Sequence, residues 1–160
     1  MDTHADHGHA PAVGGRELTR LAVSATLHCL TGCAIGEVLG MVIGTALGWS
    51  DGATIALAVA LAFVFGYSLT IAPVLRSGLS LRAALGVALA ADTLSITVME
   101  IVDNAVLLMI PGAMEAGLTS LLFWASLAFA LAVAFVVTVP VNRLLIARGK
   151  GHAVVHQFHH

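Results

Sequence analysis

The chain has 160 residues, a formal net charge of −2, and a composition in which 59% of residues are hydrophobic and only 10% are charged. A soluble globular domain carries about 25% charged residues, so this sequence could not cover a water-facing surface with charge. It also has no basic patch interleaved with aromatic residues, which excludes nucleic-acid binding and leaves the lipid bilayer as the expected environment.

The two ends of the chain are rich in histidine. Residues 1–15 and 151–160 have no apolar periodicity and are predicted to be disordered tails. Histidine-rich tracts bind transition metals, so the tails are candidates for metal capture; solvated histidines without a function are the equally weighted alternative. The histidines concerned are His4, His7, His9, His152 and His156.

Between the tails, residues 16–150 contain four apolar segments, separated by turns near residues 50–52, 76–78 and 111–112. Each is long enough to cross a bilayer, which takes about 20 residues of helix. Helices are predicted because isolated strands would leave their backbone groups unpaired in lipid. The predicted fold is an all-α bundle of four transmembrane helices, at about residues 18–49, 53–75, 81–110 and 118–146.

All seven Lys and Arg residues lie before the first span, between the second and third, or after the fourth. The positive-inside rule therefore predicts that both termini are cytoplasmic. Trp49 and Trp124 fall at the opposite interface, where aromatic side chains are enriched. The fourth span is almost purely apolar between Ser126 and Thr138, and we expect it to face lipid.

The first span carries a row of glycines spaced four residues apart, which places them on one face of a helix. Small residues at this spacing let two helices approach closely. We expect the row to pack against another span or against a second copy of the chain, and a homo-oligomer is predicted. The row consists of Gly32, Gly36, Gly40 and Gly44.

A second row on the same span combines sulfur and carboxylate groups. Soft sulfur ligands favour Cu(I) and Zn(II), and imidazole suits both ions. The predicted metal ligands are His28, Cys29, Cys33, Glu37 and Met41. The alternative is that the two cysteines are ordinary packing residues. They lie one helical turn apart and outside any loop, so no structural disulfide is expected.

The third span has one polar face, which we interpret as an ion or proton pathway made of Asp92, Ser95, Met99, Glu100 and Asp103. A carboxylate near the middle of the membrane costs at least about 2.5–3.5 kcal/mol. No Lys or Arg lies inside a span to balance it, so these groups must be protonated, bind a cation or contact water.

Depth in the membrane relates the first and third spans, because both run in the same direction. At about 1.5 Å per residue, His28, Cys29 and Cys33 are predicted near the level of Asp92 and Ser95. Glu37 is predicted near Met99 and Glu100. Asp103 is close enough to the outer interface for contact with water. The sequence therefore predicts a column of thiol, imidazole and carboxyl groups between these two helices.

Three stretches together resemble a known family. They are residues 28–37 (HCLTGCAIGE), residues 91–95 (ADTLS) followed by Met99 and Glu100, and residues 140–142 (PVN). Over about residues 20–150 the chain is similar to the bacterial domain-of-unknown-function 4396 family. The resemblance implies a compact helical domain of the bacterial inner membrane with a link to copper handling. It implies no reaction and no catalytic residues.

The leading functional hypothesis is binding or transport of a copper- or zinc-class ion at a Cys/His/carboxylate site between the first and third helices. Three alternatives stay open: proton or cation conduction through the carboxylate column, a redox protein using the thiols or a haem on His28, and an accessory subunit that docks a partner. The sequence has no Ser/His/Asp arrangement, phosphate loop or dinucleotide fingerprint, so an enzyme is the less expected class.

Overall fold

The computed structural model describes residues 14–148, without the side chains of residues 87, 88 and 91. Within residues 14–148 the chain forms four helices and no strand, which confirms the all-α prediction. The helices are α1 (Gly15–Leu47), α2 (Asp51–Arg76), α3 (Leu81–Met109) and α4 (Leu121–Ala147). The histidines of both predicted tails lie outside the described residues.

Short polar and glycine residues set the helix ends. Ser50, Ser80 and Ser120 precede α2, α3 and α4, and each accepts a hydrogen bond from a backbone N–H of the first turn. Gly48 ends α1 with a φ of 64°, a conformation that favours glycine. Because Ser120 provides the cap, the fourth helix begins at Leu121 rather than near residue 118.

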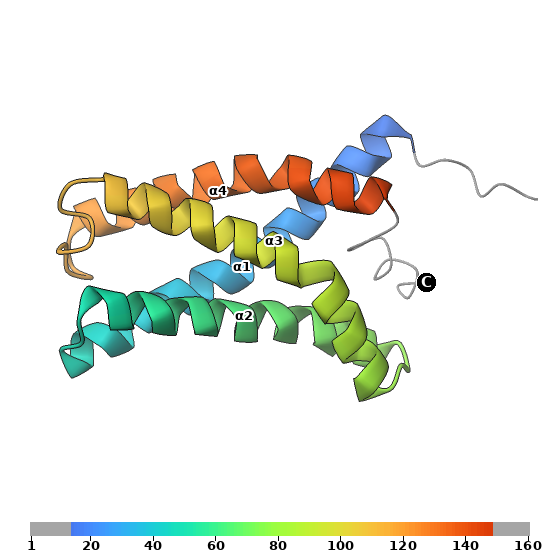
Figure 1. The fold of residues 1–160 in the computed structure, drawn as a ribbon, viewed down its shortest axis with the longest axis horizontal. Coiled ribbons are helices and arrows are strands. Elements are labelled where there is room, and N and C mark those ends of the chain that lie inside the picture. Colours follow the sequence, from blue (N-terminus) through green and yellow to red (C-terminus); the bar gives the residue numbers. More distant parts are fainter. Residues whose placement is uncertain (1–13, 149–160) are drawn as a thin grey trace, which may run out of the picture.

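Successive helices run in opposite directions, and α1 crosses the bundle obliquely, in the same direction along the bundle as α3 (Figure 1). The start of α1, the α2–α3 turn and the end of α4 share one end of the bundle, and the α1–α2 turn and the α3–α4 loop share the other. Helix α1 packs against each of the other three helices, most extensively against α2. Helix α3 also packs against the other three helices, so α1 and α3 are the two central helices of the bundle.

The glycine row of α1 packs against α2 of the same chain. A Cβ added at Gly32 would lie 2.8 Å from the Cα of Gly66, and one added at Gly40 would lie 2.6 Å from the Cα of Ala58. The remaining opposed pairs are Gly36 with Ala62 and Gly44 with Thr54. Because small residues on both helices bring the backbones this close, the row is occupied within the monomer. A homo-oligomer would have to use another surface.

Helix α4 buries one face, contrary to the expectation that it faces lipid. Its buried residues recur every three or four positions from Phe123 to Ile146 and pack against α1 and α3. The opposite face is exposed, as at Phe129 and Val136, which are 58% and 68% accessible. The expectation that this span faces lipid was therefore wrong for one face of the helix. A segment that is apolar on all sides does not show in its sequence which face is buried.

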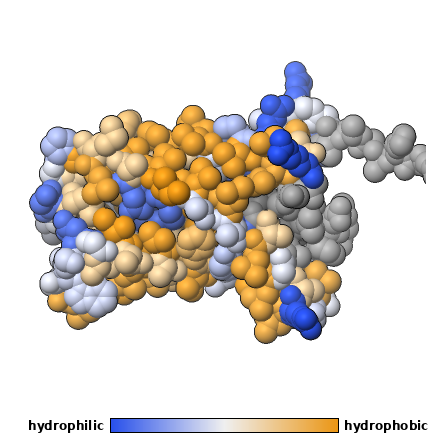
Figure 2. Space-filling view, viewed as in Figure 1, coloured by the Kyte–Doolittle hydropathy of each residue, from blue (hydrophilic) through white to orange (hydrophobic). Residues whose placement is uncertain are grey.

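The surface between the two ends of the bundle is mostly apolar, with hydrophilic side chains gathered at the ends and one hydrophilic patch interrupting this side (Figure 2). Many large hydrophobic side chains are exposed along the helices. In the described part of the chain, α1, α2 and α4 are long and apolar enough to cross a membrane. This surface suits a lipid environment and indicates a membrane protein.

Candidate functional site

The interior of the bundle contains many polar groups. Nine polar or acidic side chains from α1, α3 and α4 are almost fully buried: Thr26, Glu37, Asp92, Ser95, Glu100, Asp103, Ser126, Thr138 and Asn142. Buried polar groups require partners, because an unpaired one in an apolar interior loses its hydration without compensation. The contacts of these groups define three levels along the α1–α3 interface.

The first level is a hydrogen-bond chain that joins three helices. The Asn142 amide donates to Thr26 Oγ1 at 2.9 Å and to Ser95 Oγ at 3.0 Å. The Ser95 hydroxyl donates to Cys29 Sγ at 3.3 Å, and the Cys29 thiol points at Asp92 Oδ1 over 3.9 Å. The chain runs in one direction from amide to carboxyl group. Cys29 therefore takes part as a protonated thiol.

The second level lies one turn further along α1. Cys33 is fully buried and contacts the carboxyl group of Glu100. The Asn104 amide donates to Glu100 Oε2 at 3.3 Å and to the Glu100 backbone carbonyl at 2.8 Å. Met99 packs in the same buried cluster as Cys29 and Cys33. Glu100 and Asn104 also line a groove of about 270 Å³ between α2 and α3.

The third level is a pair of carboxyl groups. Glu37 is 5% exposed, Asp103 is fully buried, and the two side chains are in contact. Apart from this contact, none of their four oxygens has a hydrogen-bonding partner within residues 14–148. Two buried carboxylates in contact cannot both be ionised at low cost, so we expect at least one of them to be protonated.

No Lys or Arg side chain lies along the spans beside Glu37, Glu100 and Asp103. The chain has no Lys or Arg from residue 21 to residue 75 or from residue 83 to residue 142, the stretches that contain these three acids. Removing an uncompensated carboxylate from water costs several kcal/mol at least. The interior must therefore hold protons or cations to be stable.

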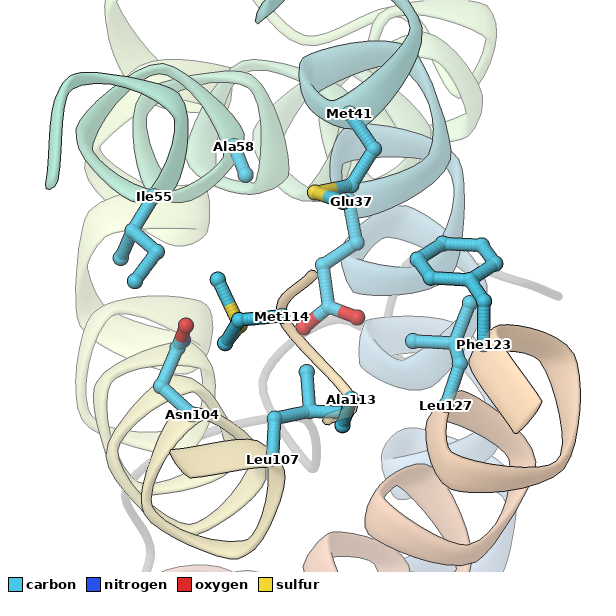
Figure 3. A pocket seen from close by; sticks show the side chains of 10 residues that line it. All are labelled: Glu37, Met41, Ile55, Ala58, Asn104, Leu107, Ala113, Met114, Phe123 and Leu127. Atoms are coloured by element: carbon cyan, nitrogen blue, oxygen red, sulfur yellow. The ribbon is translucent and has the colours of Figure 1, made fainter. Parts of the chain in front are cut away.

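A small cavity adjoins the carboxyl pair, and we call it the Glu37 cavity. It has a volume of about 30 Å³, which is room for one water molecule or one monatomic ion. Its donor atoms come from Glu37, Met41, Asn104 and Met114, and the rest of the lining is apolar. Figure 3 shows the Glu37 carboxyl group pointing into the cavity from α1, with Met114 of the α3–α4 loop facing it.

The five predicted metal ligands do not form one cluster. Cys29 faces Asp92, Cys33 faces Glu100, Glu37 and Met41 line the Glu37 cavity, and His28 Nε2 lies 3.1 Å from Thr70 Oγ1 on α2. Within residues 14–148, no group of three or more His, Cys, Asp and Glu side chains is placed to hold one metal ion. The thiols and the carboxyl groups are instead paired with each other.

The pairing predicted from equal depth in the membrane agrees with the structure at Cys29 but not at Glu37. Cys29 lies beside Asp92 and Ser95, as equal depth requires. Glu37, in contrast, lies beside Asp103. Glu100 is still near enough for an electrostatic interaction with Glu37. Asp103 does not reach water as expected, because it is fully buried. The α3–α4 loop packs over the same end of the bundle, where Ala113 is buried as well.

Two residues of the site were not singled out by sequence reasoning. Asn142 has a recognisable signal, since a polar amide inside an apolar span is costly unless it is bonded. Met114 has none, because it lies in a loop whose path over the bundle no periodicity reveals. Sequence alone could have identified the first but not the second.

Comparison with known protein families gives one match. The family model described as a domain of unknown function (DUF4396) matches residues 20–151, which include every residue of the three levels and of the Glu37 cavity. Comparisons with curated proteins and with solved structures gave no match. The chain therefore belongs to the DUF4396 family of proteins.

Proposed function

We propose that this protein is a four-span protein of the bacterial inner membrane that transfers protons through the carboxyl groups between α1 and α3. The observation that carries the proposal is the buried contact of Glu37 with Asp103, which has no positive side chain near it in any span. Such a pair is stable in lipid only when it holds a proton or another cation.

The proposed orientation has both termini in the cytoplasm. The basic residues flank the start of α1, the α2–α3 turn and the end of α4, which lie together at one end of the bundle. Trp49 and Trp124 lie near the other end, each about half exposed, and the Trp124 indole donates to the Leu118 carbonyl at 2.7 Å. Basic residues inside and tryptophans at an interface are the usual pattern for this topology.

The three levels supply a route for protons. Cys29, Cys33 and Glu37 are four residues apart on α1, so successive levels are separated by about 6 Å. Each level contains a carboxyl group on α3 that can accept and release a proton: Asp92, Glu100 and Asp103. A bridging water can carry a hydrogen bond across such a gap, and the Glu37 cavity has room for one.

A shared proton also makes the carboxyl pair suitable as a temporary store. With one proton the pair carries a single negative charge, and with a second proton it becomes neutral. Neither state has two adjacent buried charges. The doubly ionised state, which has them, would be the costly one. The pair can therefore accept a proton from one level and release it towards the cavity.

Proton flux into liposomes tests this function. Purified protein is reconstituted with an internal pH-sensitive dye, and a potassium diffusion potential drives protons inward. We expect flux above that of protein-free liposomes, and a loss of about tenfold or more in Glu37→Gln and in Glu100→Gln, since each removes a titrating group. The control is Glu115→Gln, which removes an exposed acid in the α3–α4 loop and should leave the flux unchanged.

The cysteines provide a further control. Cys29→Ser and Cys33→Ser keep a polar hydrogen at each position and should retain most of the flux. If wild-type protein conducts no more than empty liposomes, or if the carboxyl substitutions leave the flux intact, the interior is a static polar network and the proposal fails.

A transition-metal protein is the second candidate, because Cys29, Cys33 and Met99 bring three sulfur atoms into one buried cluster. Sulfur ligands of this kind select Cu(I) or Zn(II). A metal here would have to displace the thiol proton that Cys29 directs at Asp92. The test is the metal content per chain under reducing conditions, measured in the wild type, in Cys29→Ser and in Cys33→Ser. Metal that binds to the wild type and is lost in both variants supports this candidate.

A further inference from the structure

The Glu37 cavity has two thioether donors that the proton route does not use. Two methionines line it from different segments, Met41 from α1 and Met114 from the α3–α4 loop, and their side chains converge on the same space as the Glu37 carboxyl group (Figure 3). Glu37 is 5% exposed, and apart from its contact with the Asp103 carboxyl group its oxygens have no hydrogen-bonding partner within residues 14–148. A buried acid that is aimed into a cavity and has only a second acid beside it is an incomplete site.

The donor atoms define the class of ligand. Thioether sulfur is a neutral, soft donor that selects Cu(I) and related ions, whereas Mg²⁺ and Ca²⁺ require several oxygen ligands. Only one carboxylate and one amide oxygen accompany the two sulfur atoms in the lining. This set is too poor in oxygen for a hard divalent cation.

The charge of the site and the size of the cavity also indicate which cation could bind. Glu37 is the one acidic residue in the lining, and a monovalent cation would neutralise the single negative charge of its carboxylate. The volume of about 30 Å³ leaves room for a single ion that has shed its water. Flexible methionines also fill gaps in ordinary cores, but such packing does not account for the acid that they surround.

We infer that the Glu37 cavity is a binding site for one soft monovalent cation of the Cu(I) class, held by the Met41 and Met114 thioethers and the Glu37 carboxylate. The site is separate from the sulfur cluster of Cys29, Cys33 and Met99. It shares Glu37 and the cavity with the proton route but does not depend on that route, because a cation can bind here whether or not protons cross the bundle.

Methionine methyl NMR of the full chain in detergent micelles tests the inference. The chain has five methionines, so each ¹³C-labelled methyl signal can be assigned by substitution. Ag(I) serves as a probe that binds thioethers without redox chemistry. We expect the Met41 and Met114 signals to move together along one saturation curve. The Met109 signal is the internal control, since this side chain is 80% exposed and lies outside the cavity lining.

Two variants sharpen the result. Met114→Leu keeps an apolar side chain of similar size and should abolish the silver response of Met41, while Met109→Leu should leave it unchanged. Glu37→Gln should weaken binding by about tenfold or more, as expected when a charged ligand is lost.

Two results would contradict the inference. A response of Met99 alone would place the ion at the cysteine cluster, and no response of Met41 and Met114 by the point at which Met109 begins to shift would exclude the site. Either result overturns the inference. Neither bears on proton flux, which is measured without silver, so the two proposals can fail separately.

Discussion

Helix α1 makes two interfaces that differ in kind although they rest on the same four-residue spacing. Against α2 it presents glycines, and the backbones meet almost directly, as at Gly32 and Gly66. Against α3 it presents thiol and carboxyl groups that meet other polar groups, as Glu37 meets Asp103. Adjacent rows of one helix thus serve two purposes. The first provides close packing, and the second places titratable groups in a lipid-facing bundle where they are costly to keep.

Under the proposed function, the α1–α2 interface provides stability and the α1–α3 interface carries the proton route. Dispersion and close packing hold helices together in lipid, where hydrophobic burial contributes little between spans. Uncompensated buried acids lower stability and persist at functional sites. Substitutions in the two rows should therefore affect different measurements.

The largest loss of stability is expected from Gly36→Leu. Any side chain at this position would meet the backbone of Ala62, so α1 and α2 would have to separate. We expect a cost at or above the about 1–3 kcal/mol typical of overpacking, seen as a lower thermal midpoint and a smaller monodisperse fraction in detergent. Gly86→Ala in α3 is the control, because an added Cβ there meets nothing within 4 Å. Equal behaviour of the two variants would contradict close packing at this interface.

Asn142→Leu should have the next largest effect on stability. It removes the donor to Thr26 and Ser95 and leaves two buried hydroxyl groups with fewer partners. The expected cost is about 1–3 kcal/mol, measured by thermal unfolding. Thr138→Val is the matched control one turn away, since the Thr138 hydroxyl has no hydrogen-bond partner within residues 14–148. If the control costs as much as Asn142→Leu, the loss reflects packing and not the hydrogen-bond chain.

Glu37→Gln should separate stability from function. The substitution removes a buried acid that no positive group balances, so we expect a thermal midpoint equal to that of the wild type or higher. Flux and silver binding should both fall in the same protein. A marked loss of stability would show that the acid is a structural residue with a partner of its own.

Cys29→Ser should have the smallest effect. Serine keeps both the acceptor for Ser95 and a donor towards Asp92, and the change in volume is small. We expect a shift in stability within about 1 kcal/mol. Cys29→Val is the comparison, because it keeps the bulk and removes both hydrogen bonds. If Cys29→Ser lowers stability more than Cys29→Val does, the hydrogen bonds of Cys29 do not contribute to stability.

Particular residues show how far sequence alone could reach. Apolar segments and their serine and glycine boundaries predict the helices, and the spacing of Gly32, Gly36, Gly40 and Gly44 predicts close packing. The spacing cannot choose the partner helix, because any run of small residues would fit. The polar face of α3 is visible as a pattern, but which acid meets Glu37 depends on the crossing of α1 and α3. Met114 reaches the site through a loop, whose path follows from tertiary contacts.

The central claim is that the Glu37–Asp103 pair holds a proton inside the bundle at neutral pH. Infrared difference spectroscopy measures this directly, since a protonated carboxyl group has a carbonyl band that a carboxylate lacks. The account predicts such a band in the wild-type protein, altered by Glu37→Gln and by Asp103→Asn but not by Glu115→Gln. A spectrum with no protonated carboxyl band, or one that both interior substitutions leave unchanged, would contradict it.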